Sequence, residues 1–232
     1  MREIVLDTET TGLDPKSGHR IVEIGCVELF NHVPTGEVYH QYVNPERDMP
    51  AEAERVHGLS ETFLKDHPVF AEVSEKFVAF VGDATLVIHN AAFDMGFINA
   101  ELERVGVEAI PIYRAVDTVS MARKKFPGAQ ASLDALCRRF GIDLSGRELH
   151  GALLDAQLLA DVYLELLGGR QHGMDLAADA AGMVPIGDTG ASASDNGTAG
   201  RRAPRPHTIP ADEEARHAAF LEKLKDPIWL RD

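Results

Sequence analysis

The chain has 232 residues, 44% of them hydrophobic and 26% charged, which is typical of a globular protein and excludes a wholly disordered or fibrous chain. A formal net charge of −14 argues against nucleic-acid binding through a generally basic surface, although carboxylates that hold divalent cations would reverse the field locally. Two cysteines, no apolar run long enough to span a bilayer and an acidic residue near the start predict a cytoplasmic protein with no disulfides, signal peptide or membrane segment.

Strands and helices alternate over the first 170 residues. Turn signals at 12–15 and 34–36 separate the first β-rich runs, and five strands are expected: residues 3–8, 20–30, 36–43, 85–89 and 112–116. Apolar residues at helical spacing predict five helices: residues 70–81, a segment through 97–102, 118–126, 132–140 and 152–167. Because a three-strand meander is followed by strand–helix units, we expect an α/β domain with a mixed central sheet flanked by helices.

The chain changes character after the last predicted helix. No aromatic residue occurs between Tyr163 and Phe220, and residues 177–210 consist mainly of Ala, Gly, Ser, Asp and Pro. Such a segment buries too little apolar surface to offset the entropy of ordering it, so we expect a flexible linker. The final residues predict a short amphipathic helix and an apolar patch around Trp229, which either docks on a partner or folds back on its own domain.

Four acidic side chains lie at the ends of predicted strands or helices. Asp7 and Glu9 project from the same face of the first strand, where two anions repel each other unless a cation lies between them. Asp94 falls in the first turn of a helix, where capping alone would account for it. Asp155 lies beside the apolar stripe of the last helix, at whose start His150 stands, and a buried carboxylate there needs a partner.

This set of groups suits two-metal hydrolysis of a phosphodiester. Two metals about 3.5 to 4 Å apart stabilise the attacking and the leaving oxygens of the reaction. Carboxylate oxygens favour Mg²⁺ or Mn²⁺ over zinc as the bound ions. A histidine with an ordinary pKa of about 6.5 can accept the proton of the attacking water at neutral pH. Each group alone is a weak signal, and the hypothesis depends on their occurring together.

One stretch departs from the acidic character of the chain. Residues 121–140 contain a single acidic side chain, Asp134. The basic side chains of the same stretch are Arg123, Lys124, Lys125, Arg138 and Arg139. The stretch is either the solvated face of two helices or a ridge that contacts phosphates, and the sequence favours neither interpretation.

Four segments together resemble the motifs of the DEDD family of 3′–5′ exonucleases that use a catalytic histidine: DTETTG (7–12), VIHNAAFD (87–94), SLDALCRRFGI (132–142) and LHGALLDAQLLADVYLEL (149–166). The resemblance covers residues 1–170 and is strongest to family members that proofread for bacterial replicases. It implies the ribonuclease H-like exonuclease fold for that region, and removal of mismatched 3′-terminal nucleotides from DNA as the activity.

The resemblance also implies roles for individual residues. The metal ligands would be Asp7, Glu9, Asp94 and Asp155, which would hold two divalent cations, Mg²⁺ or Mn²⁺, and His150 would be the general base. The residues that would bind the terminal nucleotide are Thr10, Val56, His57, Asn90 and Phe93. The structural alternatives are a core position for Phe93, a bracing role for His57 and a turn position for Asn90.

The rest of the chain resembles the family less closely. Residues 171–207 would form the flexible linker, and its first six residues, Gln171 to Leu176, resemble a peptide that binds the sliding clamp. Residues 208–232 resemble the segment that docks on the polymerase (alpha) subunit of the replicase. Such tethering raises the local enzyme concentration at the primer end to the millimolar range, about what short flexible linkers give. The sequence does not decide whether a small accessory subunit covers the exonuclease domain.

Two alternatives remain on the residues alone. The catalytic set does not select the sugar, so a single-strand exoribonuclease, or an oligoribonuclease-like enzyme that trims RNA, would carry the same residues. The linker and docking tail argue against it, because a free-standing ribonuclease gains nothing from them. The other alternative is a non-catalytic replicase scaffold with a vestigial metal site, which the presence of every catalytic position argues against.

Overall fold

The computed structural model describes residues 1–146, 149–169 and 211–221. The chain divides into two units, Met1–Leu176 and Ala177–Asp232, and the described part of the second unit is helix α8 (Ala211–Leu221). The expected linker, the Gln171 to Leu176 peptide and the patch around Trp229 lie outside the described residues. No helix in the described part is long and apolar enough to cross a membrane.

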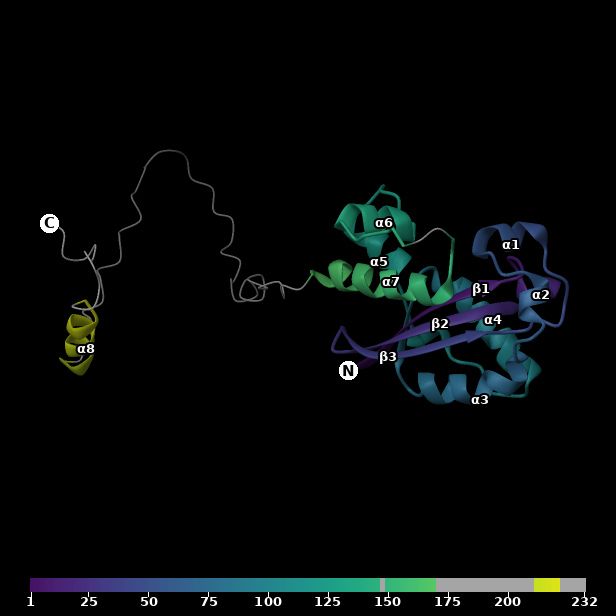
Figure 1. The fold of residues 1–232 in the computed structure, drawn as a ribbon, viewed down its shortest axis with the longest axis horizontal. Helices are drawn as coiled ribbons and strands as arrows, with labels where there is room; N and C mark the ends of the chain where they lie inside the picture. The colour runs from purple at the N-terminus through teal and green to yellow at the C-terminus, as the bar shows by residue number, and fades with distance from the viewer. Residues whose placement is uncertain (147–148, 170–210, 222–232) are drawn as a thin grey trace, which may run out of the picture. The chain divides into compact units, whose positions relative to one another are not determined.

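The first unit is built on a five-stranded mixed sheet with helices on both faces (Figure 1). Its strand order is β3-β2-β1-β4-β5, and the bounds are β1 Arg2–Thr10, β2 Ile21–Phe30, β3 Val33–Tyr42, β4 Thr85–Ile88 and β5 Ala115–Asp117. The first three strands are antiparallel neighbours, whereas β4 runs parallel to β1 and β5 parallel to β4. The predicted meander and mixed sheet are therefore confirmed.

Helices cover both faces of this sheet. Their bounds are α1 Ala51–His57, α2 Glu61–Leu64, α3 Phe70–Val81, α4 Ala91–Arg104, α5 Thr118–Lys125, α6 Leu133–Phe140 and α7 Ala152–Leu167. The five helices expected from apolar spacing are all present, and α7 has the predicted bounds. The short helices α1 and α2 were not predicted, because each is too short to show a clear apolar period.

Two local predictions are wrong. The β2–β3 turn falls at Asn31 and His32 rather than at 34–36, which lie within β3. Both turn residues have positive φ, 51° and 66°, which matches the right-handed twist of a hairpin better than an ordinary turn does. The fifth strand starts late, because residues 112–114 form a 3₁₀ turn in which the Arg114 N–H donates to the Pro111 carbonyl at 3.0 Å.

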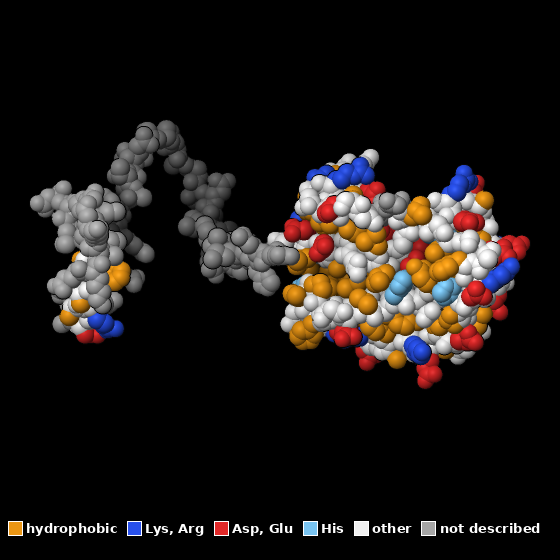
Figure 2. All heavy atoms as spheres, in the orientation of Figure 1, with side chains coloured by type: hydrophobic (Ala, Val, Ile, Leu, Met, Phe, Trp, Pro, Cys, Tyr) orange, Lys and Arg blue, Asp and Glu red, His pale blue; other side chains and the backbone are white. Residues whose placement is uncertain are grey.

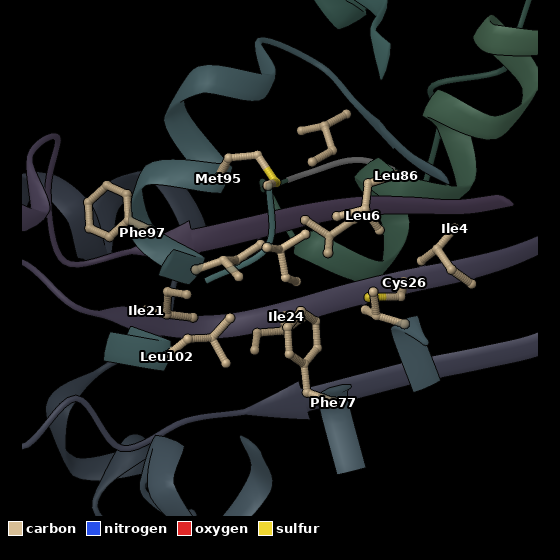
Figure 3. Packing of buried hydrophobic residues seen from close by; sticks show 14 of the residues in the cluster. Ile4, Leu6, Ile21, Ile24, Cys26, Phe77, Leu86, Met95, Phe97 and Leu102 are labelled. Carbon is tan, nitrogen blue, oxygen red and sulfur yellow. The ribbon is translucent and has the colours of Figure 1, made fainter. Parts of the chain in front are cut away.

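Each face of the sheet has its own buried layer. Ile4 and Leu6 of β1 pack against α3 and α4, in the layer whose side chains Figure 3 shows. Val5, between them, packs in the layer that α5, α6 and α7 share. Because side chains alternate along a strand, Asp7 and Glu9 have the parity of Val5 and point toward the α7 side.

Helix α7 lies in backbone contact with β2. A Cβ atom on Gly25 would lie 2.2 Å from the Ala152 carbonyl carbon and from the Leu153 amide nitrogen, so only glycine fits there. Gly25 is the register partner of Asp7 on β1. The first turn of α7 is therefore held above the strand end that carries the two acidic residues.

Replacing Gly25 by Ala should lower the free energy of unfolding by about 3 kcal/mol, because the methyl group meets backbone rather than a side chain that can move. Urea denaturation would measure the change. The matched control is Gly96→Ala in α4, where an added Cβ meets nothing within 4 Å, and which should stabilise by about 0.5 to 1 kcal/mol. Equal stability of the two variants would contradict the contact at Gly25.

Candidate active site

Three of the predicted catalytic residues meet at the start of α7. Glu9 at the end of β1, His150 just before α7 and Asp155 in its first turn each offer one ligand atom, and these atoms lie within 4.8 Å of one another. His150 Nδ1 is 3.3 Å from Asp155 Oδ2. The Asp155 side chain is 5% exposed and that of His150 is 50% exposed, so the group combines a buried carboxylate with a ring that solvent and substrate can reach.

Asp94 reaches the same strand from the opposite layer. Its Oδ1 accepts two hydrogen bonds from Thr8, one from the backbone N–H at 3.0 Å and one from the hydroxyl at 2.7 Å. Thr8 stands between Asp7 and Glu9 on β1, so these bonds fasten the first turn of α4 to the strand between the two acids. The structure thus brings all four predicted carboxylates to one end of β1.

The electrostatics of this region fit a bound cation. Burial raises the pKa of Asp94 to about 7, and the hydrogen bonds from Thr8 only partly oppose the shift. A divalent cation would restore the ionised form by supplying the missing positive charge. Because the donors are mainly carboxylate oxygens, the set suits a hard divalent ion such as Mg²⁺ or Mn²⁺.

His150 is anchored by its backbone as well as by its side chain. Its N–H donates to the Val56 carbonyl at 3.2 Å, which joins the approach to α7 to the end of α1. Helix α1 therefore positions the histidine. A Pro at its N-cap and Gly58 in left-handed conformation at its C-cap are sequence signals that would have located this helix.

A pocket of about 530 Å³ lies beside the carboxylates, between the end of β1, the loop that follows it and α1. Four of the five predicted substrate-binding residues line it: Thr10, Val56, His57 and Phe93. The fifth, Asn90, is not among the lining residues, and its backbone N–H donates to Asp117 Oδ1 at 3.0 Å. The predicted set is therefore mostly brought together, with Asn90 apart from it.

Two of these lining residues also have structural roles. His57 Nδ1 accepts a hydrogen bond from the Leu59 N–H at 3.0 Å, which leaves Nε2 as the donor nitrogen of the neutral ring. Burial lowers the pKa of His57, which favours that neutral form. Phe93 packs against the α3–α4 layer, with its ring 5.0 Å from that of Phe97. The structural and the functional explanations are thus compatible for both residues.

One wall of the pocket is the loop from Gly12 to His19, the turn that follows Thr10. A Cβ on Gly12 would lie 2.3 Å from the His19 ring, so the ring packs directly on the glycine backbone. The base of the loop is closed because the Thr11 N–H donates to the Arg20 carbonyl at 2.9 Å. Arg20 in turn is fixed to buried Glu101 of α4 by bonds of 2.6 and 2.9 Å. The loop is therefore held rigidly beside the pocket.

Comparison with known proteins agrees with this geometry. A family model described as Exonuclease matches residues 4–163, and the chain belongs to that family. It is 54% identical over 184 residues to the DNA polymerase III subunit epsilon of Rickettsia conorii, covering 78% of this chain and 80% of the relative. It is 50% identical over 176 residues to the subunit of the same name from Escherichia coli, covering 73% and 72%.

Solved structures of exonucleases share the fold. The nuclease domain of 3′hExo, a DEDDh family member bound to rAMP, superposes with a TM-score of 0.63 at 21% identity, over 72% of this chain and 91% of that one. Exonuclease X in complex with 5′ overhanging duplex DNA gives a TM-score of 0.54 at 24% identity, over 71% and 90%. The exonuclease fold expected from the sequence is confirmed.

A divalent cation should stabilise the protein, and more strongly at higher pH. Since the folded-state pKa of Asp94 is raised, the metal-free folded protein holds a proton between about pH 4 and 7 that the unfolded chain has lost, and its stability falls as pH rises through this range. Bound metal removes this penalty. Mn²⁺ at about 100 times its Kd should therefore raise the Tm by about 6 °C at pH 8, and by less at pH 5.5.

Thermal unfolding with Mn²⁺ or EDTA at the two pH values would measure this effect. Asp94→Asn should lose most of the gain, whereas the matched control Asp83→Asn, at an exposed position, should keep it. A gain that is equal at both pH values and in both variants would mean that the cation binds elsewhere.

Proposed function

We propose that this chain is the proofreading 3′–5′ exodeoxyribonuclease subunit of DNA polymerase III, which removes mismatched 3′-terminal nucleotides by hydrolysis. The observation that carries the proposal is the convergence of Glu9, His150 and Asp155 within 4.8 Å, with Asp94 fastened to the same strand. Its support from relatives is the set of epsilon subunits at 50 to 58% identity.

Each catalytic residue has a distinct role in this proposal. Asp7, Glu9, Asp94 and Asp155 would hold two divalent cations, Mg²⁺ or Mn²⁺. When bound, such ions polarise the scissile phosphate and neutralise the charge that develops on its oxygens. His150 would take the proton of the attacking water, and Asp155 Oδ2, 3.3 Å from Nδ1, would orient the ring and stabilise its protonated form.

The pocket beside the carboxylates would receive the terminal nucleotide. Thr10 and the turn after it would approach the 3′ end, Val56 and His57 would flank the base, and Phe93 would supply an apolar wall. Asn90, which was also predicted to line the cleft, is not among the residues that line this pocket. A paired end must be unstacked before it enters such a pocket, so selectivity for mismatches would come from the lower cost of fraying.

The partners follow from the subunit assignment. We infer an exonuclease domain at 1–170, a linker at 171–207 with a clamp-binding peptide at 171–176, and a segment at 208–232 that docks on the alpha subunit of DNA polymerase III. Phe220 of α8 is 54% exposed, which supports docking of that segment on a partner surface. A small accessory subunit would bind the exonuclease domain, and the protein would act in the cytoplasm with the replicase.

Activity on matched DNA and RNA strands tests the choice of sugar. With Mg²⁺, the enzyme should release mononucleotides from a 3′-deoxy end and degrade a mismatched end about tenfold faster than a paired one, because the mismatch frays at lower cost. Gel analysis of end-labelled strands would measure both rates, with Asp94→Asn as the inactive control. A strong preference for RNA ends would overturn the DNA assignment in favour of the exoribonuclease alternative.

Replacing His150 by Ala tests the general base. Loss of the proton acceptor should reduce kcat by about 10²- to 10⁴-fold. The Mn²⁺-induced rise in Tm should largely remain, since the carboxylates are untouched. The control His217→Ala, at an exposed position of α8, should leave kcat unchanged. Unchanged turnover of the His150 variant near neutral pH would mean that another group activates the water.

A further inference from the structure

The basic side chains of residues 121–140 lie on two consecutive helices, which meet where Arg139 of α6 lies over the Phe126 ring, next to the end of α5. Helix α5 ends with Arg123, Lys124 and Lys125, and α6 ends with Arg138 and Arg139. All five are exposed. Figure 2 shows Lys and Arg side chains gathered over α6 on a molecule whose acidic residues outnumber its basic ones, 37 to 23. The last turns of two consecutive helices thus carry exposed positive charge on an otherwise acidic molecule.

Part of this surface is hollowed. Ala129, Gln130, Ala135, Arg138 and Arg139 line a pocket of about 470 Å³, which we term the α6 pocket. Its polar lining consists of two guanidinium groups and one side-chain amide, and its remaining wall is the small side chains of two alanines. Guanidinium and amide N–H groups are hydrogen-bond donors that match phosphate oxygens, and no carboxylate is among the lining residues.

The basic side chains of this surface differ in how strongly contacts within the protein fix their positions. The Lys125 ammonium donates to the Glu165 and Leu166 carbonyls at 2.8 and 2.9 Å and caps the end of α7. The Arg139 guanidinium lies over the Phe126 ring, 4.5 Å from its centroid, a contact that fixes its position and leaves its edge for hydrogen bonding. Arg138 is 71% exposed, and its 3.4 Å ion pair with Asp134 costs little to exchange for a contact with a phosphate.

The surface lies beside the catalytic helix. Leu136 of α6 and Leu158 of α7 belong to one buried layer, and Leu154, next to Asp155, packs against it. In the sequence, nine residues, 141–149, separate α6 from His150. Because charges are screened over about 8 Å at physiological ionic strength, a strand near α6 meets these local cations and not the net charge of the chain.

We propose that the α6 pocket, together with Arg123 and Lys124, binds the phosphate backbone of the substrate strand on the 5′ side of the nucleotides in the catalytic cleft. The inference rests on the proposed function, since it takes a DNA 3′ end as the substrate. The contacts are to phosphates, so they add affinity for any sequence and position the strand without reading its bases.

A comparison of long and short substrates separates this site from the catalytic cleft. A dinucleotide, thymidylyl-thymidine, fills only the cleft, whereas an oligo-dT of about 20 nucleotides also reaches α6. For Arg138→Gln/Arg139→Gln, the KM for the long strand should rise about tenfold with kcat unchanged, and the slope of log KM against log salt should fall by about 0.7 for each lost contact. Hydrolysis of the dinucleotide should be unchanged.

Two further variants guard against misinterpretation. Arg138→Gln alone keeps the contact of Arg139 with Phe126 and should give a smaller change in the same direction. Lys76→Gln removes one positive charge, as Arg138→Gln alone does, but on the exposed side of α3. This control should match the wild type. Unfolding temperatures of all variants show whether the fold is intact.

The outcomes are distinct. An unchanged KM and salt slope for the long strand in the double variant would overturn the proposal. An equal loss on the dinucleotide would also overturn it, because the arginines would then serve the cleft itself. Altered inhibition by free thymidine 5′-monophosphate, with no change on the long strand, would assign the pocket to a single nucleotide instead. Failure of the wild type to degrade any DNA would overturn the proposed function and with it this inference, whereas the two outcomes above overturn the inference alone.

Discussion

The architecture of the site depends on the backbone contact between the first turn of α7 and β2 at Gly25. With no side chain between them, the helix approaches the sheet closely, and the completely buried Ala152 and Ala156 continue the small-residue contact. This approach sets the height of Asp155 and His150 above β1. A larger residue at any of these positions would lift the helix, and His150 and Asp155 would move away from Glu9 even if all three residues were retained.

The site also depends on both faces of the sheet. Glu9 and Asp155 belong to the side that α7 covers, whereas Asp94 comes from the α4 side and is joined to β1 through Thr8. The hydrogen bonds from Thr8 to Asp94 therefore fix the position of the α4 layer relative to β1 at the site. Burying a carboxylate is unfavourable unless a cation compensates it, and the pKa of Asp94, which burial raises to about 7, expresses that cost.

Much of this arrangement could be predicted from the sequence. Alternation along β1 placed Asp7 and Glu9 on one face, and the apolar stripe of α7 placed Asp155 toward the core, because both inferences rest on strong periodicity. The β2–β3 turn was misplaced because Pro34 and Gly36 are strong turn residues, yet the left-handed conformations of Asn31 and His32 suit the hairpin better. Short α1 lacked a clear apolar period and was not predicted as a helix, although two of its residues, Val56 and His57, were predicted to bind the nucleotide and do line the pocket.

Other features could not be inferred before the fold was known. Thr8 gave no signal beyond its place in a motif, since its partner Asp94 is 86 residues away. Gly25 was detectable in principle, because a glycine inside a strand often marks close approach of another backbone. That the backbone of Ala152 and Leu153 is what approaches Gly25 could be learned only from the packing of α7. The clamp between Arg20 and Glu101, 81 residues apart, is likewise a product of tertiary structure.

On the proposed function, the bonds from Thr8 to Asp94 have a consequence for the accuracy of replication. Because the proposed ligands come from two separately packed layers, a substitution deep in either layer can shift one acid relative to the others while the chain stays folded. Such a substitution would leave DNA synthesis intact and let copying errors accumulate, increasingly so on warming. Mutator alleles are therefore expected at buried apolar positions far from the scissile bond as well as among the acids themselves.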